Sequence, residues 1–240
     1  MTARKIIHGS SVKATLVSLN VGLPVDIVYD GSKTMRSGIL KKPSAGKVYL
    51  REWGFDGDGS ADLVHHRGAD KAVCAYCHER YPYWEKELSR PLSPGAFGEN
   101  LTVSGLTEKT AFIGDIYRLG EAEIQCSQPR QPCHKLSRFL GVQEMACMVR
   151  KTGFSGFYFR VLKPGWVEVG DELALVKKGS RKFSIDDANN IMHGADKMNF
   201  ARLRKIVELK FLSQSWRETF GKRLFNRAPE SVEKRLRGPD

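Results

Sequence analysis

The sequence has no long hydrophobic run. Its 240 residues contain no stretch of about 18 consecutive apolar side chains, which is what a transmembrane helix requires. The segment 1–8 begins with basic residues but lacks the apolar core of a secretion signal. Hydrophobic and charged contents of 41% and 28% are ordinary for a globular chain. Together these features predict a cytoplasmic protein without a membrane partner.

Two common site patterns are also missing. No GxGxxG fingerprint occurs, so a bound nicotinamide dinucleotide is not expected and electrons for any redox reaction should come from a partner. No second CxxC pair is present, which leaves little support for a structural zinc site. Cysteine occurs five times, and an odd number without a secretion signal predicts free thiols in a reducing compartment.

The one CxxC pair allows three interpretations. Cys74-x-x-Cys77-His78 matches the c-type haem attachment pattern, but that attachment normally requires export and no export signal is present. Zinc could be held by the two thiols with His65 or His66, although a lone CxxC pair is a weak signal. Packing of both thiols around a strand is the favoured interpretation.

The net charge of +12 is unevenly distributed. From residue 177 to the end, 16 Lys and Arg face 8 Asp and Glu, a net charge of +8. The preceding 176 residues hold the other 23 and 19, a net charge of +4. A basic last quarter favours acidic or polyanionic partners. Because it lacks a recognisable reading helix or an aromatic stacking platform, nucleic-acid binding ranks last among the hypotheses.

Short β-rich stretches separated by turns fill most of the chain before residue 177. Each combines β-branched or aromatic residues with Gly, Pro or Asp at its ends. They cover residues 12–19, 25–29, 37–43, 48–50, 96–103, 112–120, 122–126, 153–162 and 166–176. Helical patterns interrupt them at 81–88 and 136–152. Short strands at this spacing predict a mainly β, barrel-like core with peripheral helices.

The pattern changes after a basic linker. Ser184 is a suitable N-cap for one helix, Asn199 is suitable for a second helix through Leu212, and residues 215–220 form a short third helix. The predicted organisation is a β-barrel domain over 1–176, a linker over 177–183 and a three-helix appendage over 184–240.

An acidic, glycine-rich segment covers residues 54–62. Its Asp56-x-Asp58-x-Ser60 beginning has the alternating oxygen ligands of a calcium loop. It lacks the glycine at the sixth position and the glutamate at the twelfth that such a loop requires. Turn formation is the favoured interpretation.

The stretch 128–135 combines one thiol with two prolines and several cations. Prolines fix φ and remove backbone donors, so a stiff extended loop is expected. Cys133 lies beside Arg130, His134 and Lys135, and nearby cations favour the thiolate, the form that acts as nucleophile or metal ligand. The alternative is a buried structural cysteine.

Several separate motifs resemble those of the MOSC family, named after the C-terminal domain of molybdenum cofactor sulfurase. They occur in the family's order over residues 10–176, and the linker with its three helices resembles the 3-alpha extension of the bacterial YiiM-like subgroup. The matching pieces are Gly57-Asp58, His66-x-Gly68-x-Asp70-Lys71-Ala72-Val73-x-x-Tyr76, Phe97-Gly98-Glu99-Asn100-Leu101, Ile113-Gly114-Asp115 and Gln128-Pro129-Arg130-x-Pro132-Cys133-x-Lys135.

The resemblance implies a MOSC-type β-barrel that binds the molybdenum–pterin cofactor, with Cys133 as the catalytic cysteine and metal ligand; a pyridoxal phosphate site is not expected. A thiolate suits a soft metal centre. Arg130 and Lys135 would hold the cofactor phosphate. Further candidates for the cofactor pocket are Lys41, Lys42, His66, Arg67, Asn100 and Asp115. The last two would bond the pterin amide edges or position substrate, although Asp115 also suits a structural role in its turn.

The resemblance further implies reduction of N-hydroxylated compounds, such as hydroxylaminopurine-type base analogues, to amines with electrons from a separate reductase. The alternative is a sulfur or molybdenum-cofactor carrier that uses Cys133 without turnover of its own. The oligomeric state stays open, a homodimer included.

Two positions depart from the family pattern. Arg67 stands where a second glycine usually follows the histidine, which adds a cation near the expected cofactor pocket. Cys126 stands where a β-branched residue is more usual, so a disulfide between Cys126 and Cys133 is left open.

Overall fold

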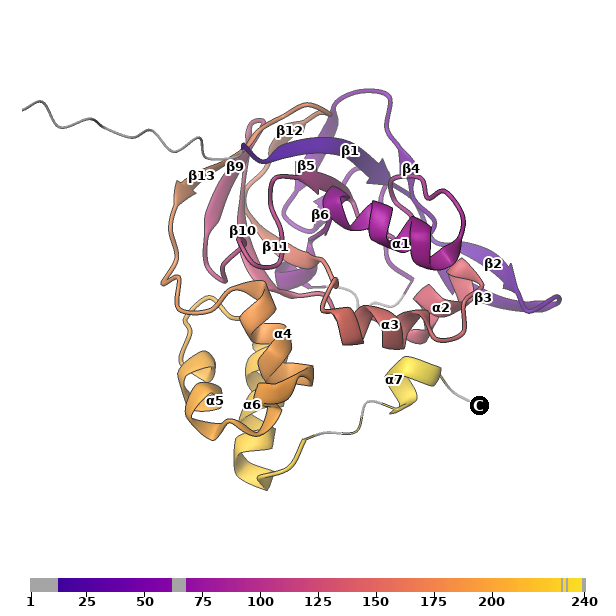
Figure 1. Cartoon of the computed structure of the whole chain (residues 1–240). Helices are drawn as coiled ribbons and strands as arrows, with labels where there is room; N and C mark the ends of the chain where they lie inside the picture. The colour runs from indigo at the N-terminus through magenta and orange to yellow at the C-terminus, as the bar shows by residue number, and fades with distance from the viewer. Residues whose placement is uncertain (1–12, 62–67, 230, 232, 239–240) are drawn as a thin grey trace, which may run out of the picture.

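The computed structural model describes residues 13–61, 68–229, 231 and 233–238 (Figure 1). Its main element is an eight-stranded curled sheet. In spatial order the strands are β13 (Leu173–Lys177), β9 (Ile116–Leu119), β10 (Ala122–Pro129), β11 (Phe157–Lys163), β7 (Val73–Cys77), β8 (Leu101–Ser104), β1 (Thr15–Val21) and β4 (Lys42–Pro43). Among these eight strands only β7 and β8 pair in parallel, and helix α1 (Tyr81–Leu88) lies in the connection between them, as a parallel crossover requires.

The sheet curls until its two sides meet. The amide N–H of Leu16 on β1 donates to the Asp171 carbonyl at 2.9 Å, and Thr15 forms a bridge with Glu172 just before β13. Two smaller sheets complete the β part: β2 (Val25–Tyr29) with β3 (Lys33–Ser37), and β12 (Gly165–Val167) with β5 (Val48–Arg51) and β6 (Gly54–Phe55). The predicted mainly β, barrel-like fold is confirmed.

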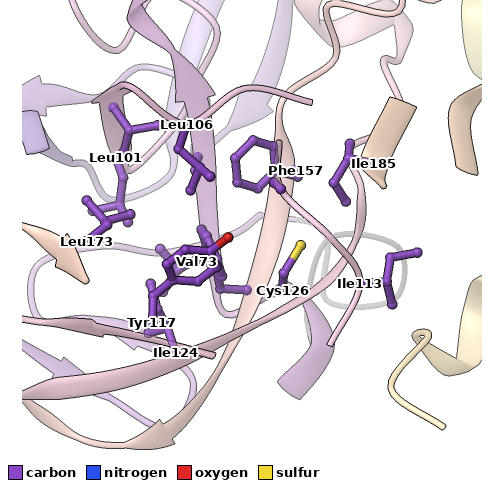
Figure 2. Packing of buried hydrophobic residues seen from close by; sticks show 14 of the residues in the cluster. Val73, Leu101, Leu106, Ile113, Tyr117, Ile124, Cys126, Phe157, Leu173 and Ile185 are labelled. Carbon is purple, nitrogen blue, oxygen red and sulfur yellow. The ribbon is translucent and has the colours of Figure 1, made fainter. Parts of the chain in front are cut away.

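The barrel interior is filled by alternate residues of the strands. On β11, Phe157 and Phe159 point inward and are fully buried, whereas Tyr158 between them is half-buried on the other face. Figure 2 shows Phe157 near Cys126 of β10 and Ile185 of the C-terminal helices. One hydrophobic cluster therefore extends from the barrel into the helical appendage.

The helices fall into two groups. A second hydrophobic cluster lies under α1, α2 (His134–Leu140) and α3 (Met145–Thr152). The appendage contains α4 (Ile185–His193), α5 (Phe200–Val207) and α6 (Gln214–Asn226), and α7 (Glu233–Arg237) packs back on α2. Single-turn 3₁₀ helices occur at Ala69–Lys71, His78–Arg80 and Ala195–Met198. No helix within the described ranges is long and apolar enough to cross a membrane.

The helical region predicted over 136–152 is two helices, α2 and α3, with residues 141–144 between them. In the appendage the two predicted N-caps are correct, but two helix ends are not. Ser184 forms a capping box with Asp187, and the Asn199 side chain caps α5 through the Arg202 amide. Helix α5 ends at Val207 and not at Leu212, because residues 208–213 turn and Arg217 donates hydrogen bonds to the carbonyls of Val207, Leu209 and Leu212. Helix α6 is longer than the predicted 215–220.

Candidate functional site

The predicted stiff loop around the thiol is shorter than expected. Strand β10 continues through Pro129, which pairs with Phe157, and helix α2 begins at His134. Only residues 130–133 connect the two elements. Cys133 is the N-cap residue of α2 with an extended backbone and is partly exposed. The sheet and the helix therefore hold the thiol from both sides.

A cavity of about 560 Å³ opens above this loop. Its walls come from the end of β10, the start of β7, the β5–β6 hairpin and the segment 37–41. Five of the predicted site residues line it: Lys41, Asn100, Arg130, Cys133 and Lys135. The tertiary structure thus brings together residues that are spread over nearly a hundred positions of the sequence.

Arg130 is the cation at the base of this cavity. Its side chain is buried, its backbone N–H donates to the Gly156 carbonyl at 3.0 Å, and no carboxylate of the described residues forms an ion pair with it. Burial lowers the pKa of the guanidinium, but the nearby groups of Cys74, Tyr158 and Cys133 raise it, so its net pKa is raised. A buried, permanently charged guanidinium that faces a cavity without a carboxylate partner is suited to bind an anionic ligand.

Lys41 differs from Arg130 because a carboxylate already neutralises it. Its ammonium group forms an ion pair with Asp58, and both side chains are largely buried. The other oxygen of Asp58 accepts a hydrogen bond from the Asn100 amide at 2.8 Å, and the Gly22 N–H donates to the first oxygen at 3.0 Å. The acidic segment that sequence analysis assigned to turn formation thus also supplies one buried carboxylate to the cavity wall.

Asn100 organises the wall of the cavity with its whole amide group. The carbonyl oxygen accepts from the Cys74 backbone N–H at 3.1 Å, and the amide nitrogen donates to Asp58 and to the Asn20 carbonyl at 3.2 Å. The adjacent Glu99 is fully buried and accepts from the backbone N–H groups of Gly95 and Phe97. The pair Glu99-Asn100 therefore positions the surrounding backbone and the side chain of Asp58 at the cavity.

Cys74 and Tyr158 also line the cavity, although sequence analysis did not assign them to the cofactor pocket. The two residues are direct cross-strand neighbours on β7 and β11, so their side chains lie on the same face of the sheet. Burial raises the pKa of the Cys74 thiol to about 11, so it keeps its proton at neutral pH. The sequence did contain a signal for Tyr158, because it alternates with two phenylalanines and must point to the opposite face of its strand. Knowing that this face lines the cavity requires the sheet register.

The CxxC pair does not form a site. Positions three apart on a strand face opposite sides, so Cys77 turns away from the cavity and donates to the Leu106 carbonyl at 3.2 Å. Packing, the favoured interpretation, describes Cys77 but not Cys74. Within the described ranges, no group of three His, Cys, Asp or Glu residues could hold a metal ion. His65, His66 and Arg67 lie outside the described residues.

Asp115 and Lys42 lie outside the cavity. Asp115 is buried beside the linker, where its carboxylate accepts from the Gly179 N–H at 2.6 Å and from Arg181 at 3.1 Å. Its position matches the structural role and not contact with a ligand in this cavity. Lys42 is exposed on β4.

No disulfide joins any of the five cysteines, all of which lie in the described part of the chain. Cys126 is fully buried in the barrel core beside Phe157 and Val73 (Figure 2), where burial strongly raises its pKa. Because Cys126 faces the core and Cys133 faces the cavity, the disulfide left open by the sequence is not formed.

Two family models match consecutive parts of the chain. The model described as "MOSC domain" matches residues 62–174, and the model described as "YiiM-like, 3-alpha helix domain" matches residues 184–226. The chain is also similar to a crystal structure of YiiM from Geobacillus stearothermophilus, with a TM-score of 0.75, 42% identity, and coverage of 88% of this chain and 99% of that chain.

Two curated relatives extend the comparison. An uncharacterized protein of Bacillus subtilis, YflK, is 50% identical over 209 residues, which are 87% of this chain and 94% of that protein. A protein of Gibberella moniliformis named "Reductase" is 35% identical over 163 residues, which are 65% of this chain but only 28% of the fungal protein.

Proposed function

Because the chain belongs to the MOSC domain family, with a YiiM-like 3-alpha helix domain after it, we propose that it binds the molybdenum cofactor and reduces N-hydroxylated compounds to amines. The observation that carries this proposal is that Cys133 shares its cavity with Arg130, which is buried and forms no ion pair with a carboxylate of the described residues. The cavity supplies one soft ligand and one strong anion-binding group, which are the two functions that a phosphorylated metal–pterin requires.

The donor set fits this cofactor better than a metal bound by protein alone. Cys133 is partly exposed to the cavity, and the described residues contain no cluster of three ligands that could complete a coordination shell. A metal held here would need most of its ligands from elsewhere, and the pterin of the cofactor would provide them. The volume of about 560 Å³ also lies in the range of small-molecule and cofactor sites.

Each residue of the cavity then has a distinct task. Cys133 would ligate the metal as thiolate, and Arg130 with Lys135 would bind the phosphate of the cofactor. Asp58 and Asn100 keep Lys41 and the Cys74 backbone in place around it. When bound, the cofactor supplies a redox centre that exchanges two electrons. The overall reaction consumes two electrons and two protons and releases the hydroxyl oxygen of the substrate as water.

The electrons would come from a separate reductase, since the sequence lacks a dinucleotide fingerprint. Similarity to part of a fungal protein named "Reductase" supports an oxidoreductase role, and the small share of that protein that matches leaves room for other functions in its remaining length. We propose hydroxylaminopurine-type base analogues as substrates and the cytoplasm as the location.

The test compares wild type with Cys133→Ala after expression in a cell that makes the cofactor. We expect wild type to contain molybdenum and to reduce an N-hydroxylated purine with a supplied reductase, and Cys133→Ala to lose the activity. Cys126→Ala is the matched control, because that thiol lies in the core and should not affect turnover per folded molecule.

The other outcomes separate the alternatives. Wild type that holds molybdenum but does not reduce the substrate, with a reductase active on another acceptor, would indicate a cofactor carrier. If neither protein contains molybdenum, the cofactor proposal is wrong.

A further inference from the structure

A second cavity, of about 770 Å³, lies where the linker and the end of α5 meet the barrel. It is lined by Ile113 of the barrel, by residues of the segment 180–183 and by residues of the segment 202–211. None of these residues lines the first cavity. The inference drawn from this cavity is therefore independent of the molybdenum cofactor.

The floor of the second cavity is apolar and rigid. Ile113, Phe183 and Leu209 are buried, and Phe211 is half-buried. The Ile113 N–H donates to the Phe183 carbonyl at 3.2 Å, which joins the barrel to the linker. Phe211 packs so closely on Gly114 that a Cβ on this glycine would lie 2.7 Å from the ring. A ligand would therefore meet a preformed surface and not a flexible loop.

The rim of the cavity is positively charged. Lys182, Lys205 and Lys210 are exposed and come from the linker, α5 and the turn after α5. No carboxylate in the described part of the chain forms an ion pair with any of the three. Glu208 is the one acidic residue of the lining, which leaves these exposed groups with a net charge of +2.

Arg202 is the fourth cation of the lining, but its charge is already compensated. Its guanidinium forms ion pairs with Asp187, at 2.6 Å, and with Asp196. The central carbon of the guanidinium lies over the Phe183 ring, 5.5 Å from the ring centroid. Arg202 therefore belongs to the wall, and the three lysines are the groups available to a ligand.

We propose that this cavity binds a small organic anion with an apolar body, such as a carboxylate or a phosphate ester. The apolar body would pack on Phe211 and Leu209, and the charged group would interact with the lysines of the rim. The volume lies within the range of about 300–1,000 Å³ that is usual for small-molecule sites, which favours a small ligand over a protein surface. Apolar walls with a few convergent charged groups are the usual composition of such sites.

The test uses the fluorescent probe anilinonaphthalene sulfonate, a sulfonate with an aromatic body, and the full-length folded protein. We expect saturable binding that Lys205→Glu and Lys210→Glu each weaken about tenfold, equivalent to about 1.4 kcal/mol. Lys222→Glu is the matched control, an exposed lysine on α6 outside the cavity. Higher salt should weaken binding to wild type, because it screens exposed charges.

A substitution that fills the cavity with a large side chain separates loss of binding from loss of folding. Ser180→Trp places an indole into the cavity from an exposed position and should abolish probe binding at an unchanged melting temperature. Arg130→Ala, in the first cavity, removes any binding of the anionic probe there and should leave the lysine-dependent binding unchanged. Binding that is lost with Arg130→Ala but unchanged by Ser180→Trp, or no binding by wild type, would overturn the proposal.

Competition identifies the source of the ligand. Displacement of the probe by a medium-chain fatty acid would assign a carboxylate, and displacement by a nucleoside monophosphate would assign a phosphate ester. If the probe binds in this cavity and neither compound displaces it, the assignment to these anions is wrong.

Discussion

Arg160 of β11 forms an ion pair with Asp70, with 2.7 Å between the guanidinium Nη2 and Oδ1. The same guanidinium donates to the Phe211 carbonyl at 2.9 Å, and the other Asp70 oxygen accepts from the Gln214 N–H at the start of α6 at 3.0 Å. Asp70 directly precedes Lys71, which lines the first cavity. This pair therefore connects the helical appendage to the segment that forms the cavity wall.

Further contacts join the appendage to the end of β10 and to the loop that follows it. The Ser213 N–H donates to the Ser127 carbonyl at 3.2 Å, and Arg235 of α7 donates to Gln131 in the loop before Cys133. Figure 1 shows α7 below α2 and α3, separated along the chain from the rest of the appendage. The three-helix part is thus attached to the motif segments through hydrogen bonds as well as through a shared hydrophobic core.

Substitution Arg160→Ala should lower the free energy of unfolding by about 2 kcal/mol. The pair is partly buried, and its loss leaves the Asp70 carboxylate without its main counter-charge. Lys13→Ala is the matched control, because its pair with Glu172 is mostly exposed and should contribute less than about 1 kcal/mol. Urea unfolding measures both. Equal effects of the two substitutions would contradict a special role of the Asp70 pair.

Substitution Asp58→Asn should reduce both stability and cofactor content. Asparagine keeps the shape and can still accept from Asn100, but Lys41 loses the charge that balances it in a largely buried position. We expect a loss of about 3 kcal/mol in the free energy of unfolding, within the range measured for broken buried pairs.

The control is Asp26→Asn, which affects an exposed pair with Arg36 outside the first cavity. Molybdenum content per folded protein, together with urea unfolding, distinguishes loss of cofactor from loss of fold. Full stability and full molybdenum content in Asp58→Asn would show that the carboxylate charge is dispensable.

Alkylation should distinguish the two thiols of the first cavity by pH. The raised pKa of Cys74, to about 11, keeps this thiol protonated at pH 7, and its burial limits access. We expect iodoacetamide to modify Cys133 first and to reach Cys74 only as the pH rises toward the pKa of that thiol. Mass spectrometry of peptides gives both rates, and equally rapid labelling at neutral pH would contradict this environment of Cys74.

His193 should make the protein sensitive to mild acid. Burial lowers the pKa of its imidazole to about 3, with further lowering by Arg235, Arg150 and Arg223. In the unfolded chain the group has its ordinary pKa of 6.5. Between these values the unfolded state binds a proton that the folded state does not, so stability is full above pH 6.5 and falls as the pH decreases.

At pH 5 this difference amounts to about 2 kcal/mol. His193→Gln should remove that part of the loss between pH 7 and pH 5, whereas His78→Gln, at an exposed histidine, should not. Urea unfolding of the three proteins at the two pH values measures the effect. The same pH dependence in wild type and His193→Gln would show that another group is responsible.

Local sequence patterns predicted a strand or helix well where the residues that define its ends are neighbours in sequence. The strand 25–29 and the helix 81–88 have the predicted bounds, and Ser184 and Asn199 cap the predicted helices. The prediction failed at α5 because the side chain that stabilises the turn after it, Arg217, belongs to the next helix. Helix ends depend on such contacts, which a local pattern does not contain.

The sequence by itself determined the fold class and the family, because both follow from the order of short motifs and from the spacing of β-rich and helical patterns. It also identified Cys133, Arg130 and Lys135 as neighbours, since they share one loop and the helix that follows it. Only the tertiary structure decided that Cys74 faces the first cavity while Cys126 is in the core, that Asp58 neutralises Lys41, and that Asp115 lies beside the linker. These relationships join positions up to 66 residues apart. The physical reason is that strand order and register decide which polar groups meet. No local sequence pattern encodes strand order or register.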